Sequence, residues 1–280
     1  MSIGSASQLN RASAGPAADA GRPMVLLENV RMAFGNFVAV DNVNIEVADG
    51  EFLAIVGPTG CGKSTILNAI AGLLKPAGGR VEIDGVPTVS IQNDIGYLFQ
   101  QEALLPWKTA IENVELGPRF RGNMDKAERT ALAQSWLTKV GLQGFEARYP
   151  HQLSGGQRKR VQMAQALITG PKVILMDEPF SALDVHTRHL MQNELLRLWQ
   201  EDRRAVIMIT HDLEEAIALG DRVVVLASGP NSYVVDSFPV DLPRPRDVSE
   251  IKLDDKFTRL YRNIWNCLRG EVEKSYARIK

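Results

Sequence analysis

Cysteine is scarce in this chain, with only Cys61 and Cys267 among 280 residues. Two cysteines so far apart do not form the disulfide framework of a small secreted domain, and we expect a reducing compartment. Long apolar stretches are missing as well, because no run approaches the roughly 20 residues that cross a bilayer. The N-terminus also lacks the apolar segment of a secretory signal. If the protein works at a membrane, something other than a membrane span of its own must hold it there.

An excess of charge of one sign is also absent. Lysine and arginine total 32 against 33 for aspartate and glutamate, which leaves a net charge of −1. This balance argues against general attraction to nucleic acid or to acidic membranes, so we expect no nucleic-acid partner. No internal repeat is visible, which favours one functional unit over a tandem pair. The hydrophobic content of 45% is that of an ordinary globular protein with a sizeable core.

Residues 1–23 are rich in alanine, serine and glycine, and we predict a disordered leader there. Short apolar runs bounded by turn residues predict strands over 24–30, 43–47, 52–56, 172–178, 204–212 and 222–227. Helices are predicted over 64–74 and 185–201, and residues 101–170 are expected to be mainly helical, with breaks at Gly117-Pro118, Gly141 and Pro150. Because strands and helices alternate, we expect an α/β core with a largely parallel sheet.

The region from about residue 240 is expected to form a C-terminal tail. It begins with LPRPRDV (242–248) and continues into a predicted helix over 257–268. Arg244 and Arg246 have two interpretations, a site for a regulatory anion or a proline–arginine linker on the surface. We favour the linker, because such segments are commonly extended and exposed.

Residues 57–65, GPTGCGKST, lie between a predicted buried strand and a predicted helix. They match G-x-x-x-x-G-K-[ST], and the strand before and the helix after are the context that this phosphate-binding motif requires. Successive amides at a helix N-terminus bind anions, and glycines let the backbone approach phosphate oxygens. We expect Lys63 to neutralise the β- and γ-phosphates, Ser64 to bind Mg²⁺ through its hydroxyl, and Thr65 to add a phosphate contact.

The whole loop is expected to contact the nucleotide. Its residues are Gly57, Pro58, Thr59, Gly60, Cys61, Gly62, Lys63, Ser64 and Thr65. A chance match within a turn is the alternative, and the flanking strand and helix argue against it. We interpret Cys61 as a small loop residue without a redox role.

Asp177 and Glu178 end the apolar run KVILMDE. The carboxyl end of a parallel strand faces the crevice where α/β sheets bind ligands. We therefore expect Asp177 to organise Mg²⁺ and Glu178 to polarise the attacking water as a general base. Two incidental acids at an exposed strand end are the alternative, which the nearby phosphate loop disfavours.

His211 follows another apolar run, AVIMIT, at the same predicted edge of the sheet. A structural role and a hydrogen bond to the γ-phosphate are both open on this pattern alone. His186 and His189 have H-x-x-H spacing without further ligands, and we interpret them as solvated helix residues.

Together these motifs resemble those of ABC-type ATPases, the motor subunits of ABC transporters, over about residues 24–235. Gln100 in YLFQQ resembles the Q-loop glutamine, LSGGQ (153–157) the family signature, and SALD (181–184) the D-loop. His211 then corresponds to the switch histidine.

The resemblance implies a P-loop NTPase (RecA-like) core, with an N-terminal antiparallel β subdomain and an inserted helical signature subdomain. It implies an ATPase domain over 24–239, helical at about 101–165, and a tail over 240–280. ATP and Mg²⁺ are the implied cofactors, with Gln100 as a further metal and catalytic contact and Phe34 stacking on adenine. The family often has Tyr where Phe34 stands and Arg where Gln165 stands. Neither departure removes a catalytic group, and we expect an active ATPase.

In this family two signature loops meet two phosphate loops head to tail. The resemblance implies that Ser154, Gly155, Gly156 and Gln157 cap the ATP held by a second ATPase subunit, and that Asp184 crosses the same interface. An anion site at a helix N-terminus is physically suited to that role. The second subunit is expected to be an identical copy or a related chain.

EALLPWKTAIENV (102–114) and LPRPRDV resemble the import group for nitrate, sulfonates, taurine and bicarbonate. The implied partners are permease subunits and, indirectly, a solute-binding protein, at the cytoplasmic face of a bacterial inner membrane. Trp107 falls in the expected docking surface for the permease; a core aromatic is the alternative. A soluble ABC ATPase acting in translation or DNA repair is the other function considered. Such proteins usually carry tandem units or long coiled-coil insertions, and neither is visible. The cargo stays open.

Overall fold

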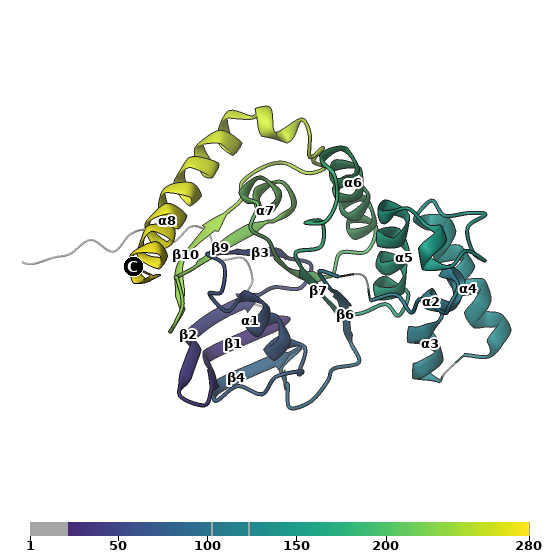
Figure 1. The fold of residues 1–280 in the computed structure, drawn as a ribbon, viewed down its shortest axis with the longest axis horizontal. Helices are drawn as coiled ribbons and strands as arrows, with labels where there is room; N and C mark the ends of the chain where they lie inside the picture. The colour runs from purple at the N-terminus through teal and green to yellow at the C-terminus, as the bar shows by residue number, and fades with distance from the viewer. Residues whose placement is uncertain (1–21, 102, 123, 280) are drawn as a thin grey trace, which may run out of the picture.

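The computed structural model describes residues 22–101, 103–122 and 124–279 (Figure 1). Most of the leader predicted over 1–23 lies outside these residues. A six-stranded sheet with the order β10-β9-β3-β8-β7-β6 forms the centre. Its strands are β3 (Phe52–Val56), β6 (Ile95–Leu98), β7 (Val173–Asp177), β8 (Ala205–Ile209), β9 (Arg222–Leu226) and β10 (Val234–Pro239). Only β10 is antiparallel to its neighbour, so the prediction of a largely parallel sheet is confirmed.

A second, antiparallel sheet has the order β2-β1-β4-β5. It consists of β1 (Val25–Phe34), β2 (Phe37–Val47), β4 (Gly78–Ile83) and β5 (Val86–Pro87). Helix α1 (Lys63–Ile70) packs between the two sheets, where its buried side chains join those of β1, β2 and β3 in one apolar cluster. In Figure 1 this sheet lies at the lower left, beneath the central one.

Four helices form a separate lobe, which projects to the right in Figure 1. They are α2 (Ala110–Val114), α3 (Leu116–Arg121), α4 (Lys126–Lys139) and α5 (Gly155–Leu167), with a short 3-10 turn over Pro150–Gln152 before α5. Helices α6 (Val185–Glu201), α7 (Leu213–Leu219) and α8 (Asp255–Ile279) cover the other face of the central sheet, and a 3-10 turn (Ile251–Leu253) precedes α8. No described helix is long and apolar enough to cross a membrane.

The alternation of side chains along β3 explains the two apolar layers. Leu53 and Ile55 are buried in the cluster with α1, whereas Phe52, Ala54 and Val56 are buried in the cluster with α5, α6 and α7. A strand buried on both faces carries a continuous apolar run, which is why FLAIV was recognisable in the sequence.

Several sequence predictions of element bounds were wrong in detail. The helix predicted over 64–74 ends at Ile70. The helical break predicted at Gly117-Pro118 falls between Val114 and Leu116, and Pro118 lies in the first turn of α3. Proline is tolerated there because the first amides of a helix have no partner within it. Strand β6 was not predicted, because it is only four residues long.

The prediction that Arg244 and Arg246 lie in a surface linker was wrong. Arg246 is 6% exposed, and its guanidinium donates to Gly220 O at 2.6 Å and Leu242 O at 3.0 Å. Arg244 donates to Asp221 Oδ1 at 2.8 Å and stacks over the Trp199 ring at 4.4 Å. A cation at the carbonyl end of α7 is favourable because that end carries partial negative charge. Burial lowers the pKa of Arg246 to about 10. The two arginines therefore join the tail to the domain.

Candidate active site

The phosphate loop connects β3 to α1, as the motif predicted. Gly60 and Gly62 have φ values of 77° and 95°, which are costly for other residues. A Cβ on Gly62 would also lie 2.5 Å from Val40 Cγ2, so the loop and β2 approach closely. Helix α1 starts at Lys63 without a side-chain cap, and its first amides are available to an anion.

Lys63 is buried at the start of α1, with 8% of its surface exposed. Its ammonium donates to Gly57 O and Pro58 O, each at 2.9 Å, and lies 3.9 Å from Cys61 Sγ. The thiol is fully buried, and burial raises the pKa of Cys61. A neutral, packed thiol agrees with the interpretation of Cys61 as a loop residue.

Substitution of Lys63 with alanine should weaken ATP binding by about 10- to 100-fold, because a hydrogen bond to a charged group contributes roughly 1.5–3 kcal/mol. Isothermal titration of the purified chain with ATP measures the change. Lys75→Ala, an exposed lysine beyond the end of the same helix, is the matched control. Equal affinities of the two variants would exclude Lys63 from phosphate binding.

Ser64 and Asp177 bring two oxygen ligands together. The Ser64 hydroxyl donates to Asp177 Oδ1 at 3.2 Å, from α1 to the end of β7. Burial raises the pKa of Asp177, while the hydrogen bond from Ser64 lowers it and the Glu178 charge raises it. Hydroxyl and carboxylate oxygens fit Mg²⁺, which protein side chains usually hold by one or two carboxylates together with substrate phosphates. Among the described residues, no cluster of three or more His, Cys, Asp or Glu side chains forms a metal site.

Glu178 is the centre of a cluster drawn from three strand ends. Gln100 Nε2 donates to Glu178 Oε2 at 3.1 Å, and His211 Nδ1 lies 3.3 Å from the same oxygen. These residues follow β6, β7 and β8, which are adjacent and parallel, so their carboxyl ends share one edge of the sheet. The three side chains line a cavity of about 710 Å³. Glu178 is thereby placed between two polar groups beside open space.

The backbone of Glu178 is strained. Its φ is 43°, in the left-handed region, where a residue with a side chain costs about 1–3 kcal/mol. Three contacts hold it there: Glu178 N donates to Ile209 O at 2.9 Å, and both Ser181 N and Ser181 Oγ donate to Glu178 O at 3.3 and 3.0 Å. This feature has no signal in the sequence, because it depends on the neighbouring strand.

Phe34 ends β1 at the tip of the β1–β2 hairpin and is 50% exposed. Phe37, its direct partner on β2, is 53% exposed and was missed by the sequence analysis. The same hairpin continues to Val40, which contacts the phosphate loop. Either ring is thus available for stacking on a base.

The sequence profile described as ABC transporter matches residues 40–181. The chain belongs to the ABC transporter family. The resemblance predicted from the sequence is therefore confirmed, and with it the ATP-binding, ATP-hydrolysing character of the subunit.

Several relatives of this ABC transporter subunit match over most of their length. An uncharacterized ABC transporter ATP-binding protein from Methanocaldococcus jannaschii is 45% identical over 253 residues, which cover 89% of this chain and 92% of the relative. The nitrate import ATP-binding protein of Synechococcus elongatus is 40% identical, with 81% and 83% covered. The taurine import ATP-binding protein of Shigella sonnei is 41% identical, with 84% and 92% covered.

A solved structure agrees with the fold. A dimeric ATP-binding cassette in a post-hydrolysis state, bound to ADP and Pi, superposes with a TM-score of 0.68 at 39% identity. The match covers 79% of this chain and 100% of that one. The P-loop NTPase fold with a helical lobe is thereby confirmed for this ABC transporter subunit.

The signature residues of the ABC transporter subunit form the start of α5. The helix begins at Gly155 itself. Ser154 is the N-cap: its Oγ accepts from Gln157 N at 3.2 Å, and Ser154 N donates to Gln157 Oε1 at 2.9 Å. A Cβ on Gly156 would lie 3.0 Å from Thr187 Cγ2, so α5 and α6 approach closely at this glycine.

The D-loop residue Asp184 caps α6 by accepting from Thr187 N at 3.0 Å, a bond that lowers the pKa of Asp184. Arg188 on the same helix was missed. It donates to Leu183 O at 3.0 Å and lies 3.7 Å from Asp212, which directly follows His211. Arg188 thereby connects the D-loop to the segment that carries His211, a link that sequence spacing does not reveal.

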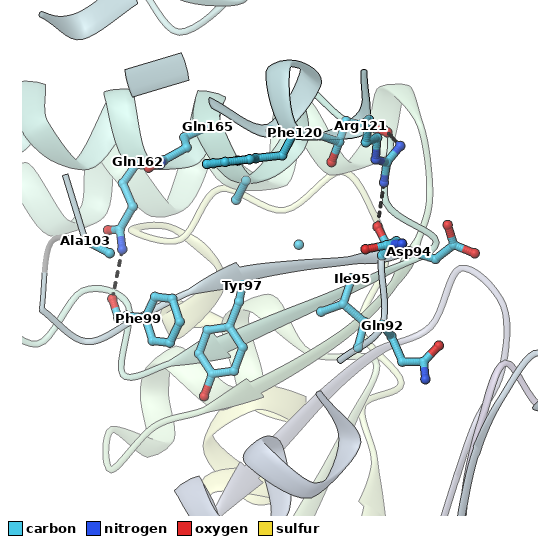
Figure 2. Close-up of a pocket in the computed structure, with 15 residues that line it drawn as sticks. Gln92, Asp94, Ile95, Tyr97, Phe99, Ala103, Phe120, Arg121, Gln162 and Gln165 are labelled. Atoms are coloured by element: carbon cyan, nitrogen blue, oxygen red, sulfur yellow. Dashed lines mark hydrogen bonds between the residues drawn. The ribbon is translucent and has the colours of Figure 1, made fainter. Parts of the chain in front are cut away.

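A groove of about 690 Å³ separates the helical lobe from β6 (Figure 2). Phe120 lies on one wall of the groove, opposite the rings of Tyr97 and Phe99 (Figure 2). These two rings stack with their centroids 4.1 Å apart. Arg121 bridges the lobes by donating to Asn93 O at 2.5 Å and Thr169 O at 2.6 Å.

Helix α5 binds the strand end that leads to the active site. Gln162 Nε2 donates to Phe99 O at 3.2 Å, and Lys159, 3% exposed, reaches the same carbonyl at 3.4 Å. Gln165, which replaces the arginine common in the family, lines the groove. Phe99 lines the groove and directly precedes Gln100 in the chain, so the groove adjoins the Glu178 cluster.

Proposed function

We propose that this chain is the ATP-hydrolysing motor subunit of a multi-subunit importer for a small anion of the nitrate, sulfonate, taurine or bicarbonate type. The observation that carries the proposal is the meeting of the phosphate loop with Asp177 and Glu178 at one sheet edge, in a chain about 40% identical over most of its length to nitrate and taurine import subunits. The proposed location is the cytoplasmic face of a bacterial inner membrane, where permease subunits hold the chain.

In the proposed cycle, two copies or two related chains bind ATP between them. The phosphate loop holds the triphosphate through its amides and Lys63, and a ring of the β1–β2 hairpin stacks on adenine. Ser154 and the first amides of α5 cap the ATP of the opposite subunit. Closure of the dimer then drives the permease pair to its outward-facing state.

The hydrolytic step belongs to Glu178. Its carboxylate accepts a proton from water as that water attacks the γ-phosphorus, and the bond to the leaving ADP oxygen breaks. Gln100 and His211, both within hydrogen-bonding reach of Glu178 Oε2, orient this carboxylate and the γ-phosphate. Mg²⁺, held by Ser64, Asp177 and Gln100, would neutralise charge on the β- and γ-phosphates.

The groove beside Gln100 is the proposed docking site for a permease segment. Phe120 is 84% exposed on its wall, and Trp107, which is 70% exposed, lies before α2 on the same lobe. That exposure contradicts the alternative in which Trp107 is a core aromatic. Exposed aromatic rings favour protein interfaces, because they bury a large area at little entropic cost.

The test of the function is an affinity purification of the tagged chain from detergent-solubilised native membranes, with mass spectrometry of its partners. Recovery of a polytopic permease encoded with a solute-binding protein is the expected result. Recovery with ribosomes or DNA-repair proteins, from the soluble fraction alone, would replace the importer with the alternative function and leave the ATPase chemistry intact.

Phe120→Asp should reduce permease recovery at least about 10-fold, because an anchor ring in an interface contributes roughly 2 kcal/mol or more. Leu253→Asp is the matched control, since Leu253 is also 84% exposed but lies in the 3-10 turn before α8. Thermal melting verifies that both variants are folded. Full recovery with Phe120→Asp would remove the groove from the interface.

A further inference from the structure

The loop between β9 and β10, residues 227–233, packs on strand β2 and on the phosphate loop. It pairs with β2: Ser232 N donates to Ala39 O at 3.1 Å, and Asp41 N donates to Ser232 O at 2.8 Å. Asn231 N also donates to Val38 O at 2.9 Å. The loop is therefore attached to the strand whose Val40 contacts Gly62 of the phosphate loop.

The same loop contacts the phosphate loop directly. A Cβ on Gly229 would lie 3.1 Å from Gly60 O and 3.5 Å from Cys61 Cα, so the two backbones are in close contact. The preceding strand contributes as well, because a Cβ on Gly57 would lie 3.1 Å from Leu226 O. A shift of the 227–233 loop therefore either opens a gap behind the phosphate loop or moves it.

Helix α8 binds this loop from the opposite side. Glu271 Oε2 accepts from Ser228 N at 3.0 Å, and Lys274 Nζ lies 2.5 Å from Glu271 Oε1. Ser228 is 3% exposed and Glu271 is 4% exposed, so the bond is shielded from water. A buried amide that loses its acceptor is costly, so the position of the Glu271 oxygen fixes the position of the loop.

The position of Glu271 is set by the packing of α8 on the domain. Phe257, Ile264 and Leu268 are buried against the core, at 3%, 0% and 8% exposure. Leu268 and Glu271 are three residues apart and so share one face of the helix. The tail thus holds the Glu271 carboxylate in a defined position next to Ser228 of the 227–233 loop.

We propose that Glu271 is a positioning residue for ATP binding, which holds the 227–233 loop against the phosphate loop through Ser228 N. The proposal rests on the nucleotide-binding role proposed for the phosphate loop. In the alternative, Glu271 only attaches the tail, and its replacement lowers thermal stability without changing affinity for ATP.

Titration of the full chain with ATP, well below its melting temperature, separates these roles. Glu271→Asp withdraws the carboxylate by one methylene and should weaken ATP binding by about five-fold, through partial loss of the buried hydrogen bond. Glu271→Gln keeps an acceptor at full length and should bind ATP within about two-fold of the original chain. Glu273→Asp, with a side chain that is 72% exposed on the same helix, is the matched control and should not differ.

Unchanged affinity in Glu271→Asp would overturn the proposal, whatever its melting temperature. Equal losses in Glu271→Asp and Glu271→Gln would do the same, because the hydrogen bond to Ser228 would then not be the cause. Failure of the original chain to bind ATP, or equal binding by Lys63→Ala, would instead contradict the proposed function.

A measurement on the unaltered chain gives an independent test. Coupling between two sites is reciprocal, so ATP should slow hydrogen exchange in residues 227–233 and in the segment of α8 around Glu271. Protection of both segments on addition of ATP is the expected result. If ATP leaves the hydrogen-exchange rate of the α8 segment unchanged, the proposed coupling is wrong. This test does not depend on whether the Glu271 variants fold.

Discussion

Replacement of Glu178 by glutamine should lower ATP turnover by about 100- to 10,000-fold, the range that a general base contributes. Glutamine has nearly the same shape and still accepts a hydrogen bond, but it cannot take a proton from water. ATP binding should persist, because the phosphate loop and Lys63 are untouched. Single-turnover hydrolysis and ATP titration of the same preparation separate the two effects.

The control for this variant is Glu214→Gln, a partly exposed carboxylate on α7 that pairs with Lys252 at 2.6 Å. It loses one charge of the same kind near His211 without touching the Glu178 cluster. Turnover of Glu214→Gln should stay within about two-fold of the original chain, as is usual for a surface ion pair. Undiminished hydrolysis in Glu178→Gln would remove Glu178 from the role of base.

Ser154→Arg should lower turnover at least about 100-fold, because a long side chain at the start of α5 obstructs closure at both sites of the dimer. The lost capping box itself costs only about 1 kcal/mol of stability. Steady-state ATPase activity, measured with the permease partner, is the appropriate readout. Full activity in this variant would contradict the role of the signature loop in the opposite site.

A mixture of Ser154→Arg and Lys63→Ala chains tests the head-to-tail arrangement. In a mixed dimer, one site combines the intact phosphate loop of the first chain with the intact signature loop of the second. Activity of the mixture should therefore exceed the sum of the two separate variants. If each signature loop served its own chain, both chains would be defective and mixing would restore nothing. The control is the activity of each variant measured alone at the same total protein concentration.

The position of the tail could not be predicted from the local sequence pattern. Proline and arginine in LPRPRDV indicated an exposed linker, yet Arg246 binds carbonyls at the end of α7 and Arg244 stacks on Trp199. These partners are far away in the sequence, and nothing in the local pattern points to them. The same is true of Glu271 on α8, whose partner Ser228 lies in the loop between β9 and β10. Long-range polar contacts of buried charges follow from the fold and not from periodicity.

Contiguous motifs in the chain were enough to predict its ATPase chemistry. A phosphate loop, an acidic strand end and a signature loop are each contiguous, because a strand followed by a tight turn and a helix is enough to form an anion site. Tertiary structure decided which strand ends meet at Glu178, how its backbone is strained, and what the tail supports. Those features depend on contacts between elements, where strand order and helix packing place side chains that the sequence leaves far apart.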